Sequence, residues 1–210
     1  LVGLALHTAG IGVRWWESYR LGIGHAPLAN FYESMIFFSW AIMLLYLVTE
    51  WRIRNRFLGP FVTPVAFLSM AYASLSPDEA TRIQPLIPAL QSNWLTSHVL
   101  TCFMGYGAFT IAFGLGVIFF ARRFVAGSGN PSKGRGGFFP DEGAIEDLIY
   151  HSTIMGFIFL SLGIITGSVW ANFAWGSYWS WDPKETWSLI TWLIYAALLH
   201  ARLIRGWRGK

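Results

Sequence analysis

Long blocks of apolar residues constrain this chain more than any other feature of its sequence. We expect helices at 30–50, 58–75, 95–121, 145–171 and 185–204, and the end of a further helix at 1–14. Each complete block holds about 18–27 residues, enough to cross a hydrocarbon core of about 30 Å at 1.5 Å per residue. Only 12% of the residues are charged, about half the usual share in a soluble domain. The sequence therefore predicts an all-α, polytopic transmembrane helix bundle in a lipid bilayer, with about six spans, the first of them partial.

The composition also excludes several classes of protein. Cys102 is the only cysteine, so the chain cannot form a disulfide framework or a thiolate metal cluster, and it lacks the C-x-x-C-H haem-attachment motif. The net charge of +4 comes from basic residues in short loops rather than from one basic face, which argues against nucleic-acid binding. No separate soluble domain is visible, so residues 1–210 are predicted to form one transmembrane domain. The start does not resemble a signal peptide, and we interpret the chain as a fragment of a longer protein.

Basic residues are divided unequally between the two ends of the expected helices. The end that holds 51–57, 122–144 and 202–210 carries 11 Lys and Arg residues, whereas the opposite end carries four. By the positive-inside rule, the end with 11 is cytoplasmic or its organellar equivalent. The tryptophan-rich segment 170–187 is therefore expected on the outer face. Segment 122–144 is rich in Gly and Ser, which predicts a flexible linker.

Four tryptophans crowd into WGSYWSWDPKETW, the thirteen residues from Trp175 to Trp187. An aromatic belt at the membrane interface explains isolated tryptophans, but a belt needs only one or two indoles per helix end. A shelf of Trp175, Trp179, Trp181 and Trp187 suits a large, planar, apolar molecule with a polar edge, because stacking would bury its faces and orient it. A porphyrin fits that description.

The charged residues beside these indoles have a local explanation. Asp182 is a suitable N-cap for the helix that follows, Pro183 suits its first position, and Glu185 completes a capping box. Lys184 either faces the carboxylates of the ligand or is simply solvated.

A haem iron in this region would need axial ligands, for which histidine is a common choice. On the expected outer face the candidates are His98, at the start of the fourth helix, and His25, in the loop before the second. His200 lies about 20 Å from Trp187 along the sixth helix, and ionisable residues within spans are usually functional. An ordinary inner-interface position is the alternative for His200. Structural positions are expected for the remaining two histidines, His7 and His151.

At the level of whole segments, WGSYWSWDPKETWSLITWLIYAALLHAR resembles the signature of the CcsA (ResC) family of cytochrome c biogenesis proteins. These belong to the haem-handling membrane proteins that are named for a tryptophan-rich WWD domain, which corresponds here to the loop at 170–187. GHAPLANFYESMIFFSW, PALQSNWLTSHV and GIITGSVWANFAWG resemble further segments of that family. The similarity covers residues 24–202, nearly the whole chain.

The resemblance implies a function in cytochrome c maturation. Proteins of this family act with a CcsB (ResB) partner, sometimes fused to it, and the pair moves haem b to the outer face. There the haem is attached by thioether bonds to the C-x-x-C-H motif of apocytochrome c, which makes the complex a holocytochrome c synthase (haem lyase). The membrane would be a bacterial inner membrane or a thylakoid membrane, with the WWD loop on the outer or lumenal side.

The resemblance also implies the roles of individual residues. His98 matches an external ligand of the haem iron, and His200 matches a ligand of a buried haem site on the transit route. The family's second external histidine follows in a further helix that this sequence does not include. The outer haem platform corresponds to Trp175, Trp179, Trp181, Asp182 and Trp187. An alternative to this function is a multi-span transporter or exporter subunit for another aromatic cargo, and a third is a structural membrane subunit.

Overall fold

The computed structural model describes residues 1–126 and 140–206, and helices are the only regular elements within these two ranges. The all-α fold expected from the sequence is therefore confirmed, whereas most of the expected linker at 122–144 lies outside the described residues. In chain order the elements are α1 (Val2–Arg20), α2 (Phe31–Ile53), α3 (Gly59–Ser74), α4 (Asp78–Thr81), the 3-10 helix η1 (Pro88–Leu90), α5 (Asn93–Ala126), α6 (Glu142–Trp175) and α7 (Pro183–Arg205).

Four of the described helices are long and apolar enough to cross a membrane, so the prediction of about six spans was too high. These four are α2, α5, α6 and α7, and they make the chain a helical integral membrane protein. The 16 residues of α3 reach only about 24 Å at 1.5 Å per residue. The last third of α1 carries Arg14, Glu17 and Arg20. The expected end of that helix at residue 14 was also wrong, because a charged residue ends an apolar block without ending the helix.

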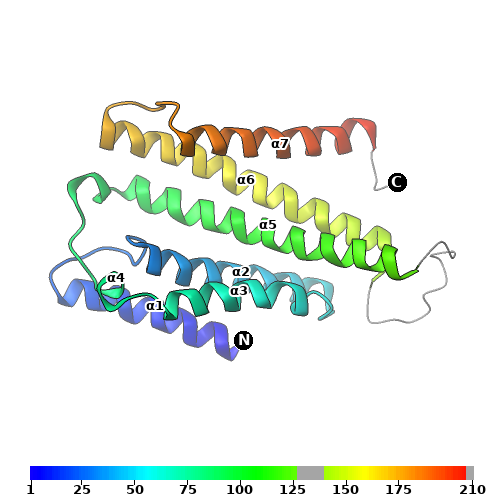
Figure 1. Cartoon of the computed structure of the whole chain (residues 1–210), viewed down its shortest axis with the longest axis horizontal. Helices are drawn as coiled ribbons and strands as arrows, with labels where there is room; N and C mark the ends of the chain where they lie inside the picture. Colours follow the sequence, from blue (N-terminus) through cyan, green and yellow to red (C-terminus); the bar gives the residue numbers. More distant parts are fainter. Residues whose placement is uncertain (127–139, 207–210) are drawn as a thin grey trace.

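The helices run alternately up and down the bundle (Figure 1). The antiparallel pair α5 and α6 forms the centre, with α1, α2 and α3 along one side and α7 along the other. The α1–α2, α3–α5 and α6–α7 connections all lie at the same end, which we call the site end. These three connections were expected to share one face, and the alternation of the helices confirms it.

Small residues allow α5 and α6 to approach closely, as in many membrane helix pairs. A Cβ at Gly105 would lie 3.2 Å from the carbonyl oxygen of Gly156, and a Cβ at Gly156 would lie 2.5 Å from the ring of Phe109. Nearer the site end, a Cβ at Gly163 would lie 2.6 Å from Cys102 Sγ. The two backbones are therefore in near contact over much of their shared length.

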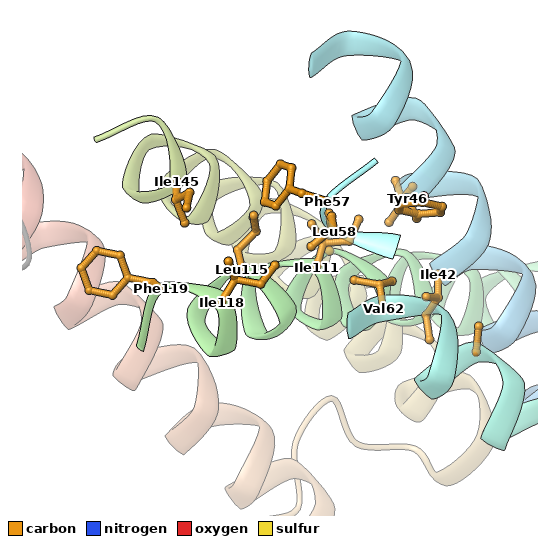
Figure 2. Packing of buried hydrophobic residues seen from close by; sticks show 13 residues of the cluster. Ile42, Tyr46, Phe57, Leu58, Val62, Ile111, Leu115, Ile118, Phe119 and Ile145 are labelled. Carbon is orange, nitrogen blue, oxygen red and sulfur yellow. The ribbon is translucent and has the colours of Figure 1, made fainter. Parts of the chain in front are cut away.

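The apolar core occupies the half of the bundle that is distant from the site end. Figure 2 shows side chains from α2, α3, α5 and α6 converging around Phe57 and Leu58, which are 0% and 1% exposed. Ile145, in the first turn of α6, and Phe119, near the end of α5, extend this cluster toward the helix ends. The core thus joins α2, α3, α5 and α6 at one end, whereas polar contacts organise the other end.

A buried carboxylate stabilises the site end. Glu33 is 2% exposed and accepts hydrogen bonds from Arg14 Nε and from the Ala29 backbone N–H, both at 2.8 Å. Arg14 also donates to the carbonyl of Thr81 at 2.7 Å. The Asn30 side chain caps α2 by accepting the Glu33 N–H at 2.8 Å. Together these bonds join α1, α2 and α4.

Removing the Arg14–Glu33 ion pair tests its contribution to stability. We expect Glu33→Ala to lower the free energy of unfolding by about 3 kcal/mol, because removing one partner of a buried ion pair leaves the other charge uncompensated. Thermal unfolding of the detergent-solubilised protein would measure the change. The exposed Glu17, on α1, provides the matched control: Glu17→Ala should change stability by less than about 0.5 kcal/mol. Equal effects of the two substitutions would contradict the prediction.

Candidate haem-binding pocket

A partly open pocket lies between α5, α6 and α7 at the site end. Its volume is about 380 Å³, within the usual range of about 300–1,000 Å³ for small-molecule sites. Its α5 wall is made by His98, Cys102 and Tyr106, which follow one another at intervals of four residues and so share one face of the helix. Helical spacing from His98 would have identified Cys102 and Tyr106 from the sequence, which our sequence analysis did not do.

His98 lies in the second turn of α5 with its ring held by α6. Its Nδ1 is 2.7 Å from the carbonyl oxygen of Gly163, which can only accept a hydrogen bond, so Nδ1 carries the proton and donates it. Among the described residues, Nε2 has no hydrogen-bond partner, and the atom is not fully buried. The Nε2 lone pair is therefore available in the pocket. This is the usual arrangement of a metal-binding histidine, in which the second nitrogen donates to a carbonyl or carboxylate.

His25, the other outer candidate, has no available nitrogen. It is 9% exposed, with Nδ1 2.8 Å from the Ala26 carbonyl and Nε2 3.1 Å from the Gln84 carbonyl. The hydrogen bond to Gln84 therefore joins the segment between α1 and α2 to the segment between α3 and α5. The two candidates that the sequence left open are thus distinguished by geometry: only His98 presents a free nitrogen to the pocket.

Trp170 is a pocket residue that the sequence analysis did not single out. Its ring stacks on that of His98, with centroids 6.4 Å apart and planes 13° apart. Its ring centroid is 6.0 Å from that of Trp175, in an edge-to-face contact. Its Nε1 donates to the carbonyl of Ala89 in η1 at 2.9 Å. Trp170 therefore connects the α3–α5 connection to the ring of His98.

The tryptophan-rich segment is less of a loop than the sequence suggested. Helix α6 continues through Trp175 and α7 begins at Pro183, so only residues 176–182 connect them. Trp175 and Trp179 line the pocket, whereas Trp181 and Trp187 do not. Trp175 is 67% exposed, much as Trp181 and Trp187 are at 69% and 66%. On α7 the pocket faces positions 184, 185 and 188, and Trp187 projects from a different side of the helix. Two of the four indoles thus line the pocket, and a single shelf made by all four stays a prediction.

The charged residues of this segment shape the start of α7. Asp182 Oδ1 accepts the backbone N–H groups of Lys184 and Glu185 at 2.7 and 2.9 Å, which confirms the predicted N-cap. Glu185 reaches further back than in a standard capping box: its Oε2 accepts from the N–H and hydroxyl of Ser180 at 2.6 and 3.2 Å. Between these two anchors, Trp181 has φ of 60°, in the left-handed region that non-glycine residues rarely adopt.

His200 is not in the pocket. It is exposed on α7, about 20 Å from Trp187 along the helix axis, at the end where Arg202 forms an ion pair with Asp147 at 3.1 Å. His151, at the same end, is exposed and has its Nδ1 2.7 Å from the Asp147 carbonyl. The structure thus separates His200 from His98, the two histidines for which the resemblance implies haem ligation. Their roles stay predictions.

His7 lines a second, larger cavity of about 720 Å³ along α1 and α2. Its Nε2 is buried without a hydrogen-bond partner among the described residues. The charged residues that share this cavity include Arg14 and Glu33, which are paired with each other. Nothing in this arrangement assigns a ligand, and the structural position expected for His7 stays a prediction.

The fold and pocket together define a helical integral membrane protein with an aromatic, histidine-bearing pocket at one end of its bundle. The family model described as "Cytochrome C assembly protein" matches residues 28–210. The chain belongs to this family, as its resemblance to CcsA-type proteins predicted. Its predicted role in cytochrome c maturation is confirmed by that membership, which also implies that the protein handles haem.

Curated relatives extend the similarity to the whole chain. Three are each named cytochrome c biogenesis protein CcsA. The one from Synechococcus sp. (strain CC9902) is 41% identical over an alignment of 226 positions that covers 98% of this chain and 73% of the relative. The one from Prochlorococcus marinus (strain MIT 9303) is 38% identical, over 100% of this chain and 73% of its own length. The one from Parasynechococcus marenigrum (strain WH8102) is 40% identical, over 100% and 75%. The chain thus spans about three quarters of the length of these relatives.

Asp182 caps α7, and two substitutions test whether the cap accounts for the contribution of this residue to stability. We expect Asp182→Ala to cost about 1 kcal/mol of stability, because the cap is lost, whereas Asp182→Asn should keep the cap and nearly all of the stability. Unfolding of the purified protein would give both values. If the asparagine variant proved as unstable as the alanine variant, the cap would not explain this residue.

Proposed function

We propose that the pocket holds haem b at the outer face of the membrane, with Nε2 of His98 bound to the iron. The hydrogen bond from His98 Nδ1 to the Gly163 carbonyl carries the proposal, because it fixes the tautomer that leaves Nε2 free. Trp175 and Trp179 offer apolar rings to the macrocycle in the same pocket. Lys184 and Asp182 also line the pocket, and the Lys184 ammonium would pair with a haem carboxylate.

In this proposal the bound haem is presented to apocytochrome c for covalent attachment. Each thiol of the C-x-x-C-H motif adds across one haem vinyl group, so that a C–S bond forms, the thiol hydrogen passes to the neighbouring carbon and no atom is lost. The residues of the pocket would contribute by holding the haem in place while the peptide approaches, which lowers the entropic cost of the encounter. A CcsB-type membrane protein would complete the complex.

The proposal assigns the site end to the outer side of the membrane. Among the described residues, seven arginines lie toward the opposite end and four Lys or Arg residues lie toward the site end, in line with the positive-inside rule. At 34 residues each, α5 and α6 are about 51 Å long, well beyond a hydrocarbon core of about 30 Å. His98 and Trp170 lie near the ends of these helices and would therefore be close to the outer interface of a bacterial inner membrane or a thylakoid membrane.

Replacing His98 tests the iron ligand. Loss of a supporting group alone weakens metal binding by about 10–100-fold, so His98→Ala should lower haem affinity at least tenfold. Absorption spectra of the purified full-length protein would report haem content and ligation. Added imidazole should restore the spectrum of a nitrogen-ligated iron by occupying the space left by the side chain. His151→Ala, at the other end of the bundle, is the control and should retain wild-type haem.

The same spectra distinguish the alternative functions. A colourless protein that moves another aromatic compound across vesicles would support the transporter interpretation. A colourless protein without transport would support a structural subunit. Unchanged haem content and ligation in His98→Ala would reject the proposed ligand.

His200 is proposed to serve a separate haem site on the route from the inner face. Because about 20 Å of α7 separate it from the level of Trp187, one haem cannot contact both histidines. We expect His200→Ala to lower total haem by about half and to leave the His98-dependent part of the spectrum unchanged. The double variant His98→Ala/His200→Ala should then lose nearly all haem. Identical spectral changes in the two single variants would show one shared site instead.

A further inference from the structure

We propose that Gly163 and Gly167 of α6 form a seat for the imidazole of His98, and that both are positioning residues for iron ligation. The inference rests on the proposed haem-ligand role of His98. It assigns a function to the segment GIITG, residues 163–167, which precedes the tryptophan-rich segment. The two glycines are four residues apart and so face α5 from the same side of α6.

Gly167 provides the space in which the ring lies. A Cβ at this position would be 2.5 Å from Nδ1, 2.7 Å from Cε1 and 3.3 Å from Cγ of His98. Carbon atoms in proteins do not approach other heavy atoms this closely without a bond, since van der Waals contact requires about 3.5–4.0 Å. Any side chain at residue 167 would therefore displace the imidazole.

Gly163 provides the hydrogen-bond acceptor. Its carbonyl oxygen is 2.7 Å from Nδ1 of His98, a distance at which a donated hydrogen bond is well formed. Its missing side chain has a different use from that of Gly167, because a Cβ at residue 163 would lie 2.6 Å from Cys102 Sγ. Cys102 follows His98 by one helical turn, so Gly163 allows that turn of α5 to approach α6.

Gly167 accommodates an aromatic ring, as Gly156 does, but the ring at Gly167 is that of the proposed iron ligand. At Gly105 the nearest atoms to a Cβ belong mainly to the α6 backbone, and at Gly156 they belong to the Phe109 ring. Those two glycines serve the contact between the helices. At Gly167 the three nearest atoms all belong to His98, so the space is occupied by the ring of the proposed ligand itself.

The first experiment replaces Gly167 in the full-length protein. We expect Gly167→Ala to lower Tm by about 5 °C, because it overpacks the site. Haem affinity should fall about tenfold, as when a group that orients a metal ligand is lost. Imidazole should restore the spectrum. Gly116→Ala on α5 is the control: a Cβ there meets nothing within 4 Å, so Tm and haem spectrum should match those of the wild type.

Two double variants separate a specific seat from a general packing defect. In a His98→Ala background the imidazole is absent, so Gly167→Ala should no longer lower Tm. Cys102→Ala removes the sulfur that a Cβ at residue 163 would meet, so it should restore the stability of Gly163→Ala. Cys102→Ala should not restore that of Gly167→Ala.

The outcomes distinguish this inference from the proposed function. If Gly167→Ala binds haem with the wild-type spectrum, or lowers Tm equally with and without His98, the seat is overturned. If His98→Ala leaves the haem spectrum unchanged, the proposed function fails. The Tm measurements of the double variants need no haem, so in that case they would still confirm or overturn the contact between Gly167 and His98.

Discussion

The near contact between the backbones of α5 and α6 is the constraint on which the pocket depends. Because Gly105, Gly156 and Gly163 lack side chains, the two helices approach until a carbonyl of α6 meets the imidazole of His98 at 2.7 Å. Membrane helices gain little from the hydrophobic effect inside a bilayer, so close packing of this kind is a main source of their association. The same packing that holds the bundle together therefore also sets the tautomer and position of His98.

One end of the bundle holds the apolar core, and the other end holds the partly open pocket. The end opposite the pocket is closed by a continuous apolar cluster around Phe57 and Leu58 (Figure 2). The site end is held by separate polar contacts, from Arg14 to the Thr81 carbonyl, from His25 to the Gln84 carbonyl, and from Trp170 to the Ala89 carbonyl. A few directional bonds fix the connections in place while leaving a partly open pocket, whereas a second apolar core would have filled it.

The sequence predicted most of the fold and the candidate ligand, but it did not predict how the pocket is shaped. Apolar blocks located six helices because burial in lipid requires them, and Asp182 and Pro183 marked the start of α7 by local capping chemistry. The number of spans was too high because an apolar block can be as short as α3. The contacts of His98 with Gly163 and of Trp170 with Ala89 join residues 65 and 81 positions apart. Such pairs depend on how two helices are rotated against each other, which the periodicity of one helix does not specify.

The depth of the pocket bears on how a haem would lie within it. From His98 to Tyr106 the α5 wall extends about 12 Å along the helix, toward the inner end of the bundle. Trp181 and Trp187, which would have widened a flat outer shelf, lie outside the pocket. Under the proposed function, a haem in this pocket would extend along α5 past Cys102 and Tyr106. Under the same proposal, the α5 wall would extend the site toward the level of His200 on α7 and would shorten the distance between the two proposed haem sites.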